Sequence, residues 1–238
     1  MLIDICFSPA LYPFYAKEND TVIVVDIFRA STTMCMALAN GASAIIPVAG
    51  VDEAKRYKAD GFLVGAERNA RKMDFADFGN SPFDYTRESV SGKDIVFTTT
   101  NGTQAIDVAR GASHLFVGAF SNISTLMKKC LQVSQRTVVL CAGWNNHINI
   151  EDTLFGGAFV DKLMEERDVV FESDAVRVAL DLWRLAKENP LDFVKTSDHY
   201  KRLVRNGAEG DAAFCFQQNT VWVVPWYDKA SKKLMVYK

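Results

Sequence analysis

The sequence predicts an α/β protein with three layers, α/β/α, built from repeated β-α-β units. Apolar runs of strand length recur along the chain, and segments with helical spacing lie between several of them. The chain has 238 residues and 49% hydrophobic content, which is enough to bury the core of one domain or of two closely packed lobes. The alternation predicts right-handed crossovers, which bring the carboxyl ends of the strands to one edge of a sheet covered on both faces.

The expected elements follow the hydrophobic pattern in chain order. Strands are predicted at Val22–Val25, Ala44–Val48, Phe62–Val64, Ile95–Phe97, Leu115–Val117 and Val138–Cys141. Helices are predicted at Met34–Ala39, Asp52–Ala59, Gln104–Ala109 and Leu154–Met164. In the last third, helical spacing over Ala175–Lys187 is followed by a polar stretch and by a late strand at Val221–Trp226 that Pro225 ends.

The chain is weakly similar to itself at an offset of 70 residues. Thr33, Ala39, Gly41, Ala42, Ser43 and Ala49 match Thr103, Ala109, Gly111, Ala112, Ser113 and Ala119. In both copies a Thr opens the expected helix and a Gly follows its end, where a left-handed residue is favoured. Two interpretations remain open: an internal duplication of β-α-β units around residues 22–49 and 92–119, or chance similarity between two such units.

Composition and charge indicate a cytoplasmic protein that acts on a small molecule. A net charge of -2 and a pI near 6.0 provide no basic field for nucleic acid, and no Lys/Arg run indicates a membrane surface. The N-terminus lacks a basic leader, and no segment has the length of a membrane span. The 16 Phe residues are consistent with burial between the subunits of a homo-oligomer.

The five cysteines indicate neither disulfides nor a zinc site. Their number is odd, and neither a C-x-x-C pair nor a His-rich spacing accompanies them. We therefore expect reduced, largely buried thiols. Cys141 lies at a strand end, but His147 stands where the loop of a cysteine phosphatase would place Arg, so we interpret Cys141 as a buried small residue.

The turn after the first predicted strand has the composition of an oxyanion site. Asp26 ends the strand, and Arg29, Ser31 and Thr32 follow before the helix. Ser31 or Thr32 is expected to cap the helix, whose free amides and dipole favour a phosphate or sulfonate beside the Arg29 guanidinium. The alternative is an ordinary helix cap with an exposed Arg.

Four other turns combine strand ends or helix starts with polar side chains. They are Val64-Gly65-Ala66-Glu67-Arg68-Asn69, Gly79-Asn80-Ser81-Pro82, Thr98-Thr99-Thr100-Asn101-Gly102-Thr103, and Cys141-Ala142-Gly143 with the helix start Glu151-Asp152. If strand order brings these turns to one edge, Asp26, Glu67, Glu151 and Asp152 repel each other unless a cation lies among them. Oxygen ligands of this kind suit magnesium, so we expect Mg²⁺ as the cofactor and these four acids as its candidate ligands.

At these residues the chain resembles the 2-phosphosulfolactate phosphatase (ComB) family. The similarity covers nearly the whole chain and rests on ordered motifs: Asp26-Ile27-Phe28-Arg29-Ala30-Ser31-Thr32-Thr33, Gly65-Ala66-Glu67-Arg68, Gly79-Asn80-Ser81-Pro82, Thr98-Thr99-Thr100-Asn101-Gly102-Thr103, Cys141-Ala142-Gly143 and Glu151-Asp152. It extends to Gly207 through Asp211, Cys215 and Val224-Pro225. Several ordered motifs are far more specific than any one of them.

The resemblance implies an α/β fold and a magnesium-dependent phosphatase, with residues 1–238 as a single catalytic unit. The implied reaction removes phosphate from a small sulfonated, carboxylated substrate, (2R)-2-phospho-3-sulfolactate, and yields 3-sulfolactate in coenzyme M-type biosynthesis. The segment Trp144–Ile150 departs from the family pattern, which has small and glycine residues there with a Ser near the acids. This departure bears on the substrate more than on the reaction.

The chemistry needs groups that position phosphate and neutralise the charge on its oxygens. We expect Arg29 and the helix starts near Ser31 and Thr103 to hold the phosphate, and Asp26 either to bind the metal or to attack phosphorus. Further substrate-binding candidates are Thr32, Arg68, Asn80, Ser81, Asn101 and Gly102. Of these, Arg68, Asn80 and Asn101 are expected to bind the carboxylate and sulfonate, which need donors besides those that hold the phosphate. For Arg68 a surface ion pair with Glu67 is an equal alternative.

His199 and Asp211 lie in a polar stretch, and an exposed loop is the simpler expectation for both, with Asp211 as a further ligand or base. Three other functions compete with the one that the resemblance implies. A haloacid-dehalogenase-like phosphatase needs a second acid where Phe28 stands. A phosphatase of a related phosphorylated hydroxy acid fits the same motifs. A non-catalytic anion-binding protein has no use for several acids without a metal.

Overall fold

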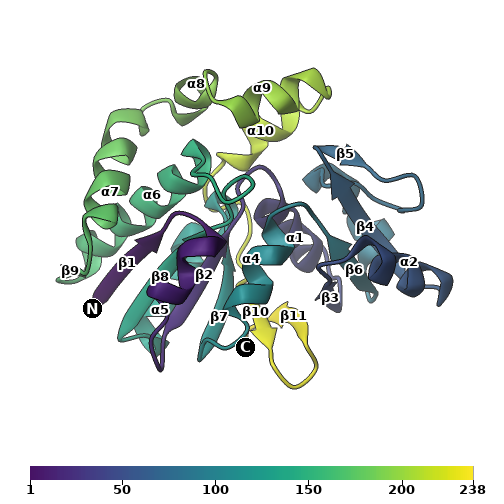
Figure 1. The fold of residues 1–238 in the computed structure, drawn as a ribbon, viewed down its shortest axis with the longest axis horizontal. Helices are drawn as coiled ribbons and strands as arrows, with labels where there is room; N and C mark the ends of the chain where they lie inside the picture. Colours follow the sequence, from purple (N-terminus) through teal and green to yellow (C-terminus); the bar gives the residue numbers. More distant parts are fainter. Residues whose placement is uncertain (238) are drawn as a thin grey trace.

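One mixed sheet of 11 strands runs through the computed structural model, which describes residues 1–237 (Figure 1). The strands are β1 Leu2–Cys6, β2 Thr21–Val25, β3 Ala44–Pro47, β4 Leu63–Arg68, β5 Arg71–Lys72, β6 Asp94–Thr98, β7 His114–Gly118, β8 Arg136–Cys141, β9 Val170–Phe171, β10 Pro225–Asp228 and β11 Lys233–Val236. Their order across the sheet is β5-β4-β6-β3-β11-β10-β7-β2-β8-β1-β9.

Helices cover both faces of this sheet, which gives the predicted three-layer α/β/α fold. They are α1 Ala30–Ala39, α2 Val51–Ala59, α3 Arg87–Val90, α4 Gly102–Ala109, α5 Ile123–Val133, α6 Ile150–Glu166, α7 Asp174–Ala186, α8 Pro190–Val194, α9 Asp198–Arg205 and α10 Glu209–Cys215. Short 3₁₀ turns lie at Pro9–Phe14, Pro82–Asp84 and Phe120–Asn122. None of the helices within residues 1–237 combines the length and apolarity that a membrane crossing requires.

The sheet consists of two parallel halves joined by an antiparallel hairpin. One half contains β7, β2, β8 and β1, and the other contains β3, β6 and β4. The hairpin β10–β11 lies between them, and its ladder with each half has one residue pair, Trp226 with Phe116 and Leu234 with Ile45. The sheet is therefore mixed, and the late strand begins at Pro225, where the sequence pattern placed its end.

The two crossovers between the halves are the segments that resemble each other in sequence. Helix α1 leads from β2 in one half to β3 in the other, and α4 leads back from β6 to β7. Residues 22–49 and 92–119 thus have corresponding positions in the fold. Their origin by duplication stays a prediction.

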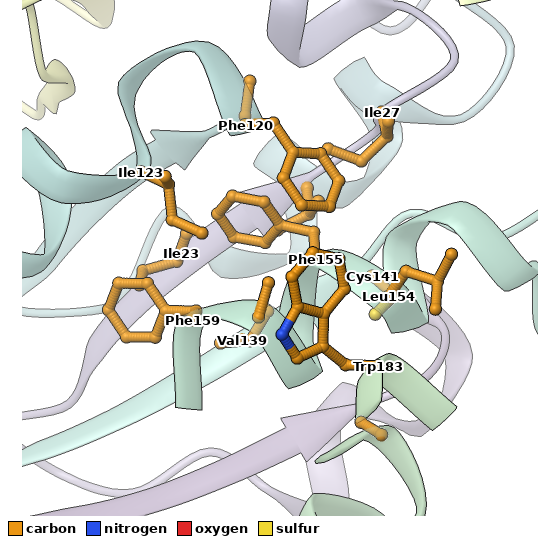
Figure 2. Close-up of a cluster of buried hydrophobic side chains, with 14 of the residues drawn as sticks. Ile23, Ile27, Phe120, Ile123, Val139, Cys141, Leu154, Phe155, Phe159 and Trp183 are labelled. Atoms are coloured by element: carbon orange, nitrogen blue, oxygen red, sulfur yellow. The ribbon is translucent and has the colours of Figure 1, made fainter. Parts of the chain in front are cut away.

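The central strands are buried on both faces, as expected for a parallel sheet between helices. On β2, Ile23 and Val25 belong to one hydrophobic cluster, while Val22 and Val24 belong to another. Figure 2 shows the first cluster, in which Phe155 and Phe159 of α6 and Trp183 of α7 pack beside Ile23 and Val139. This packing fixes the strand ends, and therefore the side chains that follow them.

All five cysteines are buried and free of disulfides, as the sequence predicted. Cys141 is the last residue of β8 and is fully buried.

Helices α8, α9 and α10 form an arm along one edge of the molecule, between α7 and the short strand β5 (Figure 1). The side chain of Asn206, just after α9, accepts a hydrogen bond from Arg71 at 2.8 Å and donates to the Asn69 carbonyl at 3.3 Å. The polar stretch expected as an open loop is therefore largely helical and is tied to the other half of the sheet.

Candidate active site

Side chains from both halves of the sheet and from the arm border one narrow cavity of about 10 Å³, which we call the phosphate cavity after the ligand proposed below. It is lined by Asp26, Phe28, Arg29, Glu67, Ala70, Asn80, Asn101, Trp144 and His199. Asp26 follows β2, Glu67 lies on β4, Asn101 precedes α4, Trp144 follows β8 and His199 lies on α9. The structure thus brings together four candidates that the sequence placed at separate turns: Asp26, Glu67, Asn80 and Asn101.

Asp26 is only 5% exposed and lies where the N-termini of α1 and α4 meet. Its backbone amide donates a hydrogen bond to Ser31 Oγ at 2.7 Å. A Cβ added to Gly102 would lie 2.7 Å from Asp26 Oδ2 and 2.8 Å from the Cβ of Ala30. Glycine at position 102 therefore allows the two helix starts to close around this carboxylate.

Burial and neighbouring acids both oppose ionisation of Asp26. Desolvation raises its pKa, repulsion from Asp152, Glu67 and Glu151 raises it further, and nearby His199 offsets part of the effect. Desolvation and the charge of Glu151 also raise the pKa of Asp152. Such a cluster of buried acids with raised pKa values is typical of a functional site.

Asp152 joins the ends of β2 and β8. Its Oδ1 accepts the amide of Ile27 at 2.8 Å, and its Oδ2 accepts the amide of Gly143 at 3.1 Å. Both oxygens therefore hold backbone that carries other site residues. Metal binding by Asp152 stays a prediction.

Glu151 is completely buried and only half of its carboxylate is paired. Oε1 lies 2.6 Å from His199 Nδ1, whereas Oε2 has no hydrogen-bond partner within the described chain. A buried carboxylate oxygen without a partner is costly, so Oε2 is available to a further ligand.

The adjacent residues Glu67 and Arg68 differ in their surroundings, because only Glu67 lines the phosphate cavity. Glu67 accepts the amide of Ala70 and borders the cavity. Arg68 is not among the lining residues and donates to the Glu67 carbonyl at 2.6 Å and to Thr98 Oγ1 at 3.0 Å. Its partners are thus a backbone carbonyl and a hydroxyl, and no ion pair with the Glu67 carboxylate forms.

Arg29 is held in the cavity by Asp211 of α10. The two side chains form a buried ion pair, 6% and 9% exposed, and Ser81 Oγ donates to Asp211 Oδ1 at 2.9 Å. Arg29 also donates to the Ala70 carbonyl at 3.2 Å, while its Nε is buried without a partner. The guanidinium is therefore fixed and keeps a free donor.

His199 and Asp211 were expected in an exposed loop, and that prediction is wrong. Both are buried, at 7% and 6% exposure, on helices of the arm. The alternative, that this polar stretch folds over the site, agrees with the structure, but the pairing itself was not predictable because the partners Glu151 and Arg29 lie 48 and 182 residues away.

The helix-start hydroxyls bind backbone groups. Ser31 and Thr32 lie inside α1, whose N-cap is Arg29 without a side-chain cap bond, so the predicted capping role is wrong. Thr32 Oγ1 donates to the Ile27 carbonyl at 3.4 Å, and Thr103 Oγ1 donates to the Thr99 carbonyl at 3.0 Å. None of the three borders the phosphate cavity.

The donor set suits Mg²⁺, although no ready-made cage is present. Within residues 1–237, no three His, Cys, Asp or Glu side chains are spaced to hold a metal ion. Mg²⁺ does not need such a cage, because one or two carboxylates with water and substrate phosphate complete its octahedron. The unpartnered Glu151 Oε2, and Asp26 and Glu67 at the cavity, are oxygen ligands of the right kind.

Comparison with known proteins relates almost the whole chain to one group. The sequence profile described as 2-phosphosulpholactate phosphatase matches residues 6–230. A protein of Thermotoga petrophila named "Probable 2-phosphosulfolactate phosphatase" is 36% identical over 224 residues, which cover 94% of each chain. A protein of Clostridium novyi with the same name is 33% identical over 239 residues, which cover 98% of this chain and all of the relative.

Proposed function

The chain belongs to the 2-phosphosulfolactate phosphatase family, and from this premise we propose that it is a phosphoric monoester hydrolase that converts (2R)-2-phospho-3-sulfolactate to 3-sulfolactate and phosphate. We further propose that it depends on Mg²⁺ and serves coenzyme M-type biosynthesis. The observation that carries the hydrolase proposal is the phosphate cavity, which the buried side chains of Asp26, Glu67 and Arg29 line together.

The acids of the cavity are the proposed metal ligands. Asp26 and Glu67 border the phosphate cavity, while Glu151 with its unpartnered Oε2 and Asp152 lie behind its lining as further candidates. When bound, Mg²⁺ would neutralise charge on the phosphate oxygens and favour the ionised forms of these acids.

Arg29 is the proposed phosphate-orienting residue. Its ion pair with Asp211 fixes the guanidinium plane, and its unpartnered Nε faces a buried site where an oxyanion would satisfy it. Preorganised donors of this kind stabilise charge on the phosphoryl oxygens without reorganising during the reaction. Asn80 also lines the cavity, and its buried side-chain Oδ1 has no hydrogen-bond partner, so this amide is available to a ligand.

Two mechanisms fit Asp26. In the first, Asp26 would bind the metal, water attacks phosphorus and loses a proton, the phosphorus–ester oxygen bond breaks, and the leaving alkoxide gains a proton. In the second, an Asp26 oxygen attacks phosphorus, the phosphorus–ester oxygen bond breaks, and the leaving alkoxide takes a proton. Water then attacks the aspartyl phosphate, and phosphate leaves as the carboxylate is restored. Acid quench during turnover distinguishes them, since only the second leaves phosphate covalently attached to the protein.

The function is tested by phosphate release from 2-phospho-3-sulfolactate and from p-nitrophenyl phosphate, with and without Mg²⁺. We expect release that stops with EDTA, returns with added Mg²⁺, and is lost in Asp26→Asn. Asp107→Asn, which removes an exposed carboxylate paired with Arg110 at 2.8 Å, is the matched control and should keep activity. Binding of sulfolactate without hydrolysis under any condition would instead favour a non-catalytic anion-binding protein.

A further inference from the structure

A second, larger cavity adjoins the phosphate cavity. It has a volume of about 500 Å³ and is lined by the loop between β8 and α6 and by α9 with the residues before it. Trp144 and His199 border both cavities, and Glu151 also lines the larger one. We call it the Arg202 cavity, after the cation on its α9 side. A molecule bound in either cavity would therefore contact Trp144 and His199, which line both.

The loop that forms this cavity is a tight hairpin turn. The amide of Trp144 donates to the His147 carbonyl at 2.9 Å, and the amide of His147 donates back at 2.8 Å. Asn145 and Asn146 between them have φ values of 48° and 62°, as a type I′ turn requires. Residues directly opposite in such a hairpin project to one side, so Trp144 and His147 both face the cavity.

Gly143 permits this turn. Its φ is +62°, and a Cβ there would lie 2.4 Å from the His147 carbonyl oxygen. The turn is also attached to the phosphate cavity, because the Asn145 amide donates to Asn101 Oδ1 at 3.3 Å. The position of Trp144 is therefore coupled to the site where phosphate is proposed to bind.

Arg202 of α9 places an unpaired cation in this cavity. Its guanidinium carbon lies 3.6 Å from the centroid of the Trp144 ring, a cation–π contact that covers one face of the plane. Nε is buried without a partner, and within residues 1–237 the nearby acids Glu151 and Asp198 do not come close enough to form an ion pair with it. Stacking leaves the in-plane N–H groups free, and these match the two oxygens of a carboxylate or sulfonate.

Asn149 adds a second unsatisfied group. Its side chain is 8% exposed, and both Oδ1 and Nδ2 are buried without hydrogen-bond partners in the described chain. The Nδ2 group acts as a weak donor to the nearby Asp152 carboxylate and lowers its pKa, so Oδ1 is the atom that most needs a partner. Buried amides are nearly always paired, so an unpaired one lining a cavity indicates a ligand.

We propose that the Arg202 cavity binds an oxyanion on the organic part of the substrate, its carboxylate or its sulfonate, with Arg202 as the specificity-determining residue. This rests on the phosphatase function proposed above, because such a substrate carries oxyanions besides the phosphate. The sequence had suggested Arg68 for this role, but Arg68 is occupied by backbone and Thr98. The binding surface comes from the loop Trp144–Ile150 and from α9 with the residues before it.

Discrimination among four phosphate esters tests the proposal. 2-Phospho-3-sulfolactate carries both oxyanions, 2-phospholactate only the carboxylate, O-phosphoisethionate only the sulfonate, and p-nitrophenyl phosphate neither. We expect Arg202→Gln to lower kcat/KM for the esters that use the subsite about 10- to 100-fold relative to p-nitrophenyl phosphate, mainly through KM. The ester whose preference collapses identifies the oxyanion. Arg202→Lys should restore part of the preference, because it keeps the charge without the planar fork.

Arg205→Gln is the matched control, since Arg205 lies on the same helix, is exposed and does not line this cavity. An unchanged preference in Arg202→Gln, or an equal loss in Arg205→Gln, overturns the proposal. A binding experiment tests the subsite separately from the hydrolase function. Binding of 3-sulfolactate is measured by the change in Trp144 fluorescence, which Trp144→Phe should abolish. If no ester is hydrolysed but this signal remains and requires Arg202, the function fails and the subsite stands; without the signal, the subsite also fails.

Discussion

At the residue scale, the phosphate cavity depends on small positions as much as on charged ones. Position 102 has no room for a side chain, because a Cβ there would lie 2.7 Å from Asp26 Oδ2 and 2.8 Å from the Cβ of Ala30 on the neighbouring helix start. The Asp26 carboxylate, which is proposed to act in the reaction, is thus positioned by Gly102 and Ala30, which have no reactive groups.

Gly102→Ala should damage activity more than stability. Its new Cβ would lie 2.7 Å from Asp26 Oδ2, so the carboxylate or α4 must shift. Overpacking of this kind costs about 1–3 kcal/mol, and a displacement near 1 Å lowers kcat about 100-fold. Gly111→Ala, where no atom lies within 4 Å, is the control. Phosphate release and thermal unfolding measure the two effects, and full activity in Gly102→Ala would show that Asp26 is not constrained.

Asp211→Asn should leave Arg29 buried without its counter-charge. Both side chains are largely buried, so losing one partner costs about 3–5 kcal/mol in the free energy of unfolding. The KM for phosphate esters should also rise, because the guanidinium loses its orientation. Asp107→Asn, from an exposed pair with Arg110, should cost less than about 1 kcal/mol. Urea titrations of both variants make the comparison, and equal losses would contradict it.

Residue roles were predictable from sequence only where the strand ends determined them. Asp26 and Glu67 come shortly after predicted strands, Val22–Val25 and Phe62–Val64, so the sequence predicted that both lie at the carboxyl edge of the sheet. The direction of Arg68 could not, because it depends on whether its side chain meets Thr98 or the cavity. The pairing of His199 with Glu151 depends on how the arm folds, which no local pattern encodes.

At the element scale, the amino-terminal ends of β2 and β8 are joined by a charge cluster away from the phosphate cavity. Arg136 of β8 donates to Asp20, just before β2, and to Glu172, just after β9. Lys17 adds a contact to Glu172 at 2.8 Å. This cluster ties the edge strand β9 and the first loop to the centre of the sheet.

The cluster should make stability depend on pH. Desolvation acts to raise the pKa of Glu172, but hydrogen bonds from Lys17 and Arg136 outweigh it and leave the pKa below its usual 4.5. The ionised form is therefore favoured by folding, so its contribution is complete above pH 4.5 and is lost as pH falls through the lower folded-state pKa.

Glu172→Gln is expected to destabilise the protein near neutral pH and to lose this penalty in acid. Urea unfolding at several pH values measures the difference between variant and wild type. Glu18→Gln, at an exposed position of the first loop, controls for the loss of a carboxylate. A difference that does not shrink below pH 4.5 would assign no role to the Glu172 charge.

Most elements with a clear hydrophobic period were predicted, but helix α5 was missed although its buried residues Ile123, Leu126, Met127 and Cys130 recur at helical spacing. The six expected strands are all present, from β2 to β8. Strand β1 was not recognised because Asp4 interrupts its apolar run, yet the Asp4 carboxylate is satisfied by the Ile5 amide at 2.9 Å and by Ser173. Helices α8 to α10 are short and polar, and their stability comes from contacts with distant parts of the chain.

At the scale of the whole molecule, the hairpin β10–β11 joins the two halves of the sheet across single residue pairs. The phosphate cavity draws side chains from both halves, so its geometry depends on this joint. The three-layer fold was predictable from the strand–helix alternation. The joint was not, because its strands come last in the chain and pair antiparallel with strands far upstream.

Leu234→Ala should weaken the joint and the site together. Leu234 is fully buried beside Ile45, so the truncation should cost about 2–5 kcal/mol. Val236→Ala on the same strand, at 38% exposure, should stay within about 0.5 kcal/mol. Thermal unfolding and activity near the transition measure both, and loss of activity should coincide with unfolding. Equal melting temperatures for the two variants would show that the joint does not hold the halves.

The buried cysteines provide a chemical reporter of the folded state. Burial raises the pKa of Cys35 and that of Cys215 to about 12, so almost no thiolate exists at neutral pH. Iodoacetamide should therefore leave the native protein unmodified, and mass spectrometry should find alkylation only when the chain opens. A common rate at all five sites would reveal a single cooperative opening of the whole chain, whereas earlier labelling of Cys215 would reveal that the arm opens first.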